Sequence, residues 1–385
     1  MAIENVINEA HRVVAIAPLP SMGLDRALSV VWTVGRRCNY ACSYCSKDFH
    51  DRVSPHRSYG ELRAIWANIR QAMAPRDLVA AIEFTGGEPT LNPDFLEFVR
   101  YLNQSQRPWL RWMGMTSNGT AGLEYYQQIC EHLDWICFST HFEWWDENRF
   151  MTMLLDLKRS LAGKGRDTML SVNLMYEEWN APHIRKIDNI LKAENIRSTP
   201  LYIYNIYGSK GITNKSSTPF DYAAYMHERG GTTAPAGHVP EPRTPEPAAS
   251  VTDALLQHSN RLLDKTNTEL TLDDGTTLQV HSQIFSNLHL NNFPGWKCHA
   301  GKDRIFIYPN GKIYGGTCLL GELGDVRKPL KLREEPVTCD GRDCFCMTDI
   351  LVKKWKQDVH EPSGVHGTAP APEDADATRQ ASAAD

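Results

Sequence analysis

Short apolar segments alternate with helix-like segments from about residue 29 to 206, and this alternation constrains the fold more than any other feature. The candidate strands are Ser29–Gly35, Val79–Thr85, Leu110–Thr116, Asp134–Thr140, Thr168–Met175 and Thr199–Asn205. Amphipathic stretches lie between them, at Tyr59–Ala74, Asn92–Ser105, Gly122–His132, Asp146–Lys164 and Ala181–Ala193. Alternation at this spacing indicates parallel βαβ units. Six units predict an α/β fold with a partial (β/α)6 barrel of the TIM type, whose active site lies at the carboxyl ends of the strands.

Composition narrows the class of protein. The chain has 385 residues, of which 42% are hydrophobic, enough for a substantial core and two or three domains. Its net charge of -5 lacks the basic signature of a nucleic-acid-binding protein. The first 26 residues show no apolar signal-peptide core, and no apolar run approaches the length of a membrane span. We therefore expect a soluble cytoplasmic protein that binds neither nucleic acid nor membrane.

The composition changes after the alternating region. Residues 229–250 are rich in Gly, Pro and Ala, which predicts a flexible linker. A helix at 251–264 and two hairpins follow, because Asp274-Gly275 and Asn310-Gly311 are dipeptides that favour tight turns. The expected organisation is an N-terminal extension (1–28), a barrel core (29–228), the linker (229–250), a small hairpin and helix domain (251–360) and a polar, disordered tail (361–385).

Three cysteines stand close together after the first candidate strand. Cys38, Cys42 and Cys45 have the spacing C-x3-C-x2-C. An iron–sulfur cube normally takes four cysteine ligands, so three thiols leave one iron open to a substrate group. The alternatives are three thiols in an ordinary loop, or a zinc site that recruits a fourth ligand such as His50.

This segment resembles the radical SAM superfamily, whose signature places an aromatic residue, here Tyr44, before the last cysteine. Further elements of that family follow in order: Phe84-Thr-Gly-Gly-Glu-Pro89, Met115-Thr-Ser-Asn-Gly-Thr120, Cys137-Phe-Ser-Thr-His141 and Leu170-Ser-Val-Asn-Leu174. The resemblance implies that the three cysteines hold a 4Fe-4S cluster whose open iron binds S-adenosylmethionine. It also implies reductive cleavage to a 5′-deoxyadenosyl radical, and hence a one-electron donor such as flavodoxin or ferredoxin.

The resemblance further implies roles for residues at the strand ends. The family's Gly-Gly-Glu-Pro element binds the methionine amino group, and here it is Gly86, Gly87, Glu88 and Pro89. The remaining cofactor contacts implied are Ser117 and Asn118 for the methionine moiety, Ser139 for the ribose, Asn173 for the nucleoside and Tyr44 for the adenine.

A second group of cysteines lies in the C-terminal third: Cys298, Cys318, Cys339, Cys344 and Cys346. Four soft thiolates around one centre suit zinc or an iron–sulfur cluster. The stretch resembles the twitch (SPASM-like) extension of some radical SAM enzymes, which implies an auxiliary 4Fe-4S cluster. Five thiols fit one cluster with one cysteine to spare or one site left open, and Cys344 and Cys346 are the uncertain pair.

Other reactive residues have plainer interpretations. Cys130 and Cys137 lie in apolar surroundings and are expected in the core. His141, Glu143 and Asp146 follow the fourth strand, where a proton acceptor is possible but solvated loop residues are the stronger interpretation. Trp144 and Trp145 either line a substrate pocket or cover the barrel.

The expected function is therefore a radical SAM enzyme acting on a small molecule such as a sugar, an aminocyclitol or an amino-acid derivative. One alternative is a peptide-modifying maturase. It is disfavoured because only 37 residues precede Cys38, too few for a fused peptide-recognition domain. The other alternative is a non-catalytic iron–sulfur or zinc-binding protein.

Overall fold

A computed structural model of the chain describes residues 10–164, 168–176, 180–203, 220–228, 266–288, 290–344 and 346–361. The expected linker, the expected helix at 251–264 and tail residues 362–385 lie outside these ranges. None of the described helices is long and apolar enough to cross a membrane.

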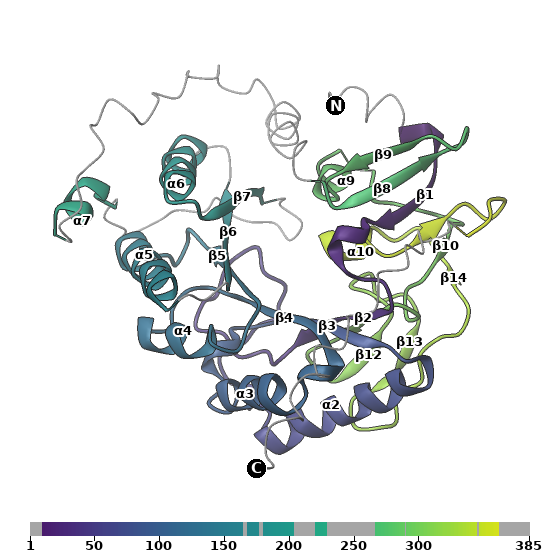
Figure 1. Cartoon of the computed structure of the whole chain (residues 1–385), viewed down its shortest axis with the longest axis horizontal. Helices are drawn as coiled ribbons and strands as arrows, with labels where there is room; N and C mark the ends of the chain where they lie inside the picture. The colour runs from purple at the N-terminus through teal and green to yellow at the C-terminus, as the bar shows by residue number, and fades with distance from the viewer. Residues whose placement is uncertain are drawn as a thin grey trace, which may run out of the picture.

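A parallel sheet forms the centre of the molecule, and its strands follow one another in chain order (Figure 1). The strands are β2 (Ala27–Thr33), β3 (Val79–Thr85), β4 (Leu110–Ser117), β5 (Trp135–Thr140), β6 (Met169–Tyr176) and β7 (Arg197–Tyr202). Every neighbouring pair among them is parallel. The α/β class and the six predicted βα units are confirmed, with strand ends displaced by no more than a few residues.

Helices cover the outer side of this curved sheet (Figure 1). They are α2 (Tyr59–Met73), α3 (Phe95–Ser105), α4 (Leu123–Ile129), α5 (Glu147–Gly163), α6 (Ala181–Ala193) and α7 (Tyr222–Glu228). Local sequence explains where α2 begins: Ser58 and Glu61 form a reciprocal capping box that satisfies backbone N–H groups of the first turn.

The two faces of the parallel sheet differ in polarity. On β2, residues Leu28, Val30 and Trp32 are fully or almost fully buried and pack with Trp66 of α2 and Phe98 of α3. Because successive side chains of a strand point to opposite faces, Ser29 on β2 and Glu83 on β3 lie on the inner face. The apolar core therefore sits between sheet and helices, and polar groups line the inside.

The C-terminal part extends this sheet and builds a second one. Strand β11 (Arg304–Ile307) pairs parallel with β2, and β12 (Lys312–Tyr314) and β13 (Glu322–Asp325) follow antiparallel. Among the described residues the second sheet has the order β14-β10-β15-β1-β8-β9. Its strands are β14 (Val337–Thr338), β10 (Lys297–Cys298), β15 (Lys354–Trp355), β1 (Val13–Pro18), β8 (Thr268–Leu272) and β9 (Thr277–Val280).

Both predicted hairpins are present, as β8–β9 and β11–β12. The short helices α9 (Gln283–Asn287) and α10 (Met347–Ile350) complete this part. Strand β1, from the segment expected to be an N-terminal extension, lies between β15 and β8. The second sheet is thus assembled from both ends of the described chain.

A buried ion pair joins the parallel sheet to helix α10. The Arg304 side chain on β11 is 1% exposed and donates to Asp349 of α10 at 2.6 Å, to Ser29 of β2 at 3.0 Å and to Thr348 at 2.7 Å. The second Asp349 oxygen accepts from the Thr317 backbone N–H at 2.8 Å. Each of the three guanidinium nitrogens thus has a partner despite its burial, which fixes α10 against the parallel sheet.

We expect Asp349→Ala to lower the free energy of unfolding by about 3–5 kcal/mol, because it leaves the Arg304 charge buried without its partner. The change is measured by urea unfolding. Arg327→Ala is the matched control: it breaks an ion pair with Asp325 whose arginine side chain is 78% exposed, and we expect a loss of no more than about 1 kcal/mol. Equal losses in the two variants contradict this role for Arg304–Asp349.

Candidate functional site

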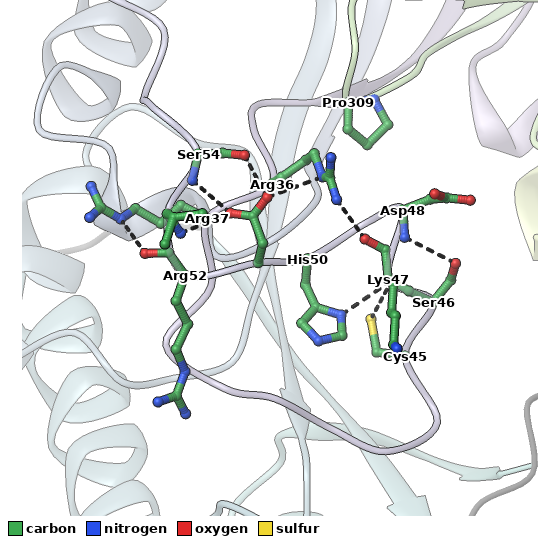
Figure 2. Close-up of polar contacts among 12 residues, drawn as sticks. Arg36, Arg37, Cys45, Ser46, Lys47, Asp48, His50, Arg52, Ser54 and Pro309 are labelled. Atoms are coloured by element: carbon green, nitrogen blue, oxygen red, sulfur yellow. Dashed lines mark hydrogen bonds and ion pairs between the residues drawn. The ribbon is translucent and has the colours of Figure 1, made fainter.

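The loop between β2 and α2 carries Cys38, Cys42 and Cys45 and is closed by its own hydrogen bonds (Figure 2). The Cys38 N–H donates to the Asp51 carbonyl at 2.8 Å, and the Asp51 N–H donates to the Arg36 carbonyl at 2.9 Å. The Ser54 hydroxyl, above all, lowers the pKa of Asp51 to about 2. Arg36 reaches across the loop to the Lys47 carbonyl at 2.7 Å. These contacts hold the cysteine segment in one conformation.

The three thiols are largely withdrawn from water. Cys42 is 7% exposed and the other two are partly buried. Desolvation raises the pKa of all three, that of Cys45 to about 11, so the thiols favour their neutral form. Binding iron as thiolates therefore requires the metal's own charge. His50, the zinc ligand considered from sequence, instead places Nδ1 3.2 Å from the Ser46 carbonyl (Figure 2).

Gly86 and Gly87 follow β3 and bring its end against the cysteine loop. Both have positive φ, +87° and +51°. A Cβ on Gly87 would lie 2.4 Å from the Arg37 carbonyl oxygen, closer than any real contact. The Gly87 N–H donates to the Phe49 carbonyl at 3.3 Å, and the Glu88 N–H to the Arg37 carbonyl at 2.9 Å. Glycine is required here because loop and turn approach backbone to backbone.

Glu88 is the buried centre of the site, with 2% exposure. One carboxylate oxygen accepts from the Ser117 hydroxyl at 2.9 Å and the Thr90 N–H at 3.1 Å, and the other accepts from the Asn118 N–H at 2.6 Å. Burial raises the pKa of Glu88, while these hydrogen bonds oppose that shift. The Thr90 side chain also hydrogen-bonds this carboxylate, so donors of the protein itself meet its roughly four acceptor positions. Pro89 is buried beside it and begins a short 3-10 helix.

Ser117 and Asn118 lie at the end of β4 and differ in what they can still bind. The Ser117 hydroxyl also contacts the Tyr126 hydroxyl at 2.8 Å and accepts from the Gly119 N–H at 3.2 Å, which uses its hydrogen-bonding capacity. The Asn118 side-chain amide faces the cysteine loop. It donates to Asn39 at 2.8 Å and lies 4.0 Å from Cys38 Sγ.

Asn39 and Thr120 also belong to this network, although neither of them was assigned a role from the sequence. Thr120 donates its hydroxyl to Asn118 at 2.6 Å, and Asn39 donates to the Thr120 hydroxyl at 2.8 Å. Together with Asn118 they close a ring of side chains between the end of β4 and the cysteine loop. In the sequence, the only signal for these two residues was that each is a polar residue close to Cys38 or Asn118.

Ser139 and Asn173 are brought together, because they are register partners on β5 and β6. They lie on the inner face, two residues beyond Cys137 and Ser171 respectively. Ser139 is 8% exposed and Asn173 is partly buried. Cys130 and Cys137 are buried as expected, and desolvation raises the pKa of Cys137 to about 11.

The segment after β5 packs on the cysteine loop rather than being free in solvent. The Tyr44 hydroxyl contacts His141 Nδ1 and the two rings stack. The Glu143 carboxylate accepts from the Ser43 backbone N–H at 2.6 Å and from the Ser43 hydroxyl. Asp146 caps α5 by accepting from the Arg149 N–H at 3.1 Å. His141 and Glu143 are partly buried and support the structure locally, whereas Asp146 is exposed, as expected of a solvated loop residue.

The two tryptophans separate into different environments. Trp145 is 3% exposed and packs on Phe142 and Phe150, so it belongs to the core. Trp144 is 42% exposed, stacks with Tyr40 and lies under the Arg52 guanidinium. Arg52 also borders an open pocket of about 320 Å³ beside Cys38, which Arg37, Asn39 and Leu91 complete.

The C-terminal cysteines gather around the edge of the second sheet. Cys298 and Cys344 are buried, and Cys318, Cys339 and Cys346 are partly buried. The β10–β14 pairing brings Cys298 opposite Val337, and the Cys339 N–H donates to the Trp296 carbonyl at 2.8 Å. Arg342 ties Cys318 to the same region through the Cys318 carbonyl at 3.2 Å. Cys346 contacts the Thr348 hydroxyl at 2.8 Å. Across the described ranges, no three His, Cys, Asp or Glu side chains converge on one metal-ion position.

We expect Gly87→Ala to retain much less iron than the parent protein after anaerobic reconstitution. The added Cβ collides with the Arg37 carbonyl, and the left-handed backbone adds about 1–2 kcal/mol of strain, so the cysteine loop is displaced. Gly35→Ala is the control, since its Cβ would meet no atom within 4 Å. Iron per chain is measured by colorimetric assay. Equal iron in both variants contradicts the role of Gly87.

His141 predicts a specific pH dependence of stability. Burial lowers its pKa from 6.5 to about 4, so the folded protein resists protonation that the unfolded chain accepts. The contribution of neutral His141 to the free energy of unfolding is therefore complete above pH 6.5 and is lost as the pH falls towards 4. Between pH 7 and pH 5 we expect metal-free protein to lose up to about 2 kcal/mol more than His141→Phe in urea unfolding. Parallel stability curves contradict this.

Comparisons with known proteins agree with the site. Residues 32–141 match the family model of the radical SAM superfamily. The chain is 38% identical over 70 residues to an S-adenosylmethionine-dependent nucleotide dehydratase of Selenomonas ruminantium, covering 18% of this chain and 23% of that protein. It is 26% identical over 161 residues to a GTP 3′,8-cyclase of Actinobacillus pleuropneumoniae, covering 39% and 45%. The chain spans less than half the length of these curated relatives.

Among solved structures, anSMEcpe with bound AdoMet aligns over 78% of this chain and 75% of its own, at 13% identity and a TM-score of 0.45. Streptococcus suis SuiB bound to precursor peptide SuiA aligns over 75% and 59%, at 15% identity and a TM-score of 0.43. The assignment rests on the family model, which includes all three clustered cysteines and the Gly-Gly-Glu-Pro turn. Residues 32–141 of the chain are therefore similar to the radical SAM superfamily, in agreement with the motifs in its sequence.

Proposed function

We propose that the chain is a radical SAM enzyme that acts on a small-molecule substrate. The observation that carries the proposal is the attachment of the cysteine loop to the ends of β3 and β4, through the Glu88 backbone and carboxylate. When bound at Cys38, Cys42 and Cys45, a 4Fe-4S cluster and S-adenosylmethionine supply a 5′-deoxyadenosyl radical that abstracts hydrogen from the substrate. The donor set fits this group, since three thiols in one fixed loop leave one iron open.

The residues around the loop would bind and orient the cofactor. The buried negative charge of Glu88 is suited to attract the methionine ammonium. Gly86 and Gly87 expose the backbone beside it. Asn118 holds the loop through Asn39 and approaches the Cys38 sulfur, so it positions a ligand. Ser117 acts indirectly, by fixing the Glu88 carboxylate.

The nucleoside half of the cofactor would lie towards β5 and β6. Ser139 and Asn173 sit side by side there and are proposed to contact the ribose and the base. Tyr44 would border the adenine, with its ring held by stacking on His141. The walls of the inner face would exclude water from the reacting atoms.

The C-terminal cysteines are proposed to hold an auxiliary 4Fe-4S cluster. We retain residues 29–228 as the core and 251–360 as the auxiliary domain, to which the β1 segment contributes a strand. A small-molecule substrate is supported by the names of the curated relatives, which refer to a nucleotide, to GTP and to heme. A peptide substrate is the alternative.

Partners and compartment follow from this chemistry. The reaction needs one electron for each cleavage, so a flavodoxin or ferredoxin is the proposed donor. All ten cysteines are free thiols, as expected in the reducing cytoplasm.

Anaerobic reconstitution tests the proposal. With dithionite and S-adenosylmethionine, we expect the protein to form 5′-deoxyadenosine, which is measured by liquid chromatography. We expect Cys42→Ala to lower the yield at least about 100-fold, which is equivalent to about 2.8 kcal/mol in activation free energy. Cys130→Ala removes a buried thiol outside the site and should retain the activity. Loaded protein that makes no 5′-deoxyadenosine supports the non-catalytic iron–sulfur alternative instead.

A further inference from the structure

Lys354 is a cation in an unusual place. It lies on β15, opposite Cys298 of β10 and Ile16 of β1, and its side chain is 1% exposed. Its ammonium donates to the Asp349 carbonyl at 2.8 Å and the Ile350 carbonyl at 3.2 Å, and lies 3.7 Å from Cys344 Sγ. The fourth side is closed by the Phe293 ring, 4.6 Å away. All three N–H groups of the Lys354 ammonium are used, and in the metal-free protein each of their acceptors is uncharged.

The charge itself has no anionic partner in the described part of the chain. No ion pair joins Lys354 to a carboxylate there, and the carboxylate of Asp349, whose backbone carbonyl accepts from the ammonium, is already paired with Arg304. Removing an ammonium from water costs several kcal/mol unless an opposite charge compensates it. Two carbonyl dipoles and a ring face offset only part of that cost. We therefore expect an anion to lie beside this ammonium.

The groups that can supply the anion are the thiols around it. Cys344 touches the ammonium and Cys298 is its register partner across β10–β15. Cys339 is held close to Cys298 through the Trp296 carbonyl. Four thiolates around an iron–sulfur cube leave a net negative charge, which grows by one on reduction.

We propose that the Lys354 ammonium is the internal counter-charge of the auxiliary iron–sulfur cluster, and that it favours the reduced state of that cluster. This rests on the proposed function, because it requires the C-terminal thiols to bind the cluster. It also selects Cys344, of the uncertain pair Cys344 and Cys346, as the ligand beside the cation. A nearby positive charge stabilises the more negative, reduced form and so raises the reduction potential.

The test uses the full chain with Cys38, Cys42 and Cys45 all changed to Ala, so that only an auxiliary cluster can form. After anaerobic reconstitution, the midpoint potential is measured by a redox titration followed by electron paramagnetic resonance. We expect Lys354→Met to shift the midpoint to a more negative value and Lys354→Arg to stay near the parent. Lys353→Met is the matched control, since Lys353 is the adjacent residue and its amine pairs with Glu361 at 3.2 Å. Its midpoint should not move.

Thermal unfolding separates a counter-charge from a merely structural lysine. In metal-free protein, Lys354→Met should unfold at the parent temperature or above it, because an uncompensated charge is gone. In cluster-loaded protein the same variant should unfold below the parent. Lys354→Gln removes the charge but keeps a hydrogen-bond donor, so it provides a second neutral variant if the methionine variant does not fold.

The possible failures are distinguishable. If the Cys38/Cys42/Cys45 variant takes up no iron and sulfide, or takes up zinc instead, both the auxiliary cluster and the counter-charge are overturned. If it takes up about four irons and the Lys354→Met midpoint is unchanged or more positive, only the counter-charge is overturned. Equal destabilisation of the metal-free and loaded variants also overturns it.

Discussion

A single buried carboxylate, that of Glu88, organises the candidate active site. Its oxygens take donors from the end of β4, and its backbone N–H binds the carbonyl of Arg37 in the cysteine loop. A carboxylate is costly to bury unless donors surround it, so this arrangement is stable only when both strand ends and the loop are in place together. The thiols are thereby positioned by a polar contact deep in the fold, although they lie in a 25-residue loop (34–58) between β2 and α2.

The parallel core could be predicted from sequence because each of its units leaves a local pattern. Val79–Thr85 is an apolar run of strand length, and Ala181–Ala193 shows helical spacing, and both have the predicted bounds. No local sequence pattern predicts the pairing of β1 with β8, because it joins segments some 250 residues apart and depends on register rather than composition. The parallel pairing of β11 with β2 could not be predicted from the sequence for the same reason.

The site was predictable to the level of motifs but not of contacts. The cysteines and the Gly-Gly-Glu-Pro turn do meet, since strand ends of one parallel sheet share an edge. Ser117 was expected to face the cofactor, and its hydroxyl is instead used within the protein. The roles of Asn39 and Lys354 could be recognised only from the structure, because a polar residue in a loop or a lysine in a strand is ordinarily exposed. The assigned cofactor contacts remain predictions.

The central position of β1 has a consequence for biosynthesis. This strand is made about 250 residues before its partner β8 and more than 300 residues before its partner β15. Until then both of its hydrogen-bonding edges are unpaired, which is the condition that promotes intermolecular strand pairing. The C-terminal thiols also have no completed sheet beneath them during this interval. Under the proposed function, the auxiliary cluster would therefore be inserted only after these strands are made, and a chain cut before β8 should aggregate rather than form a smaller working protein.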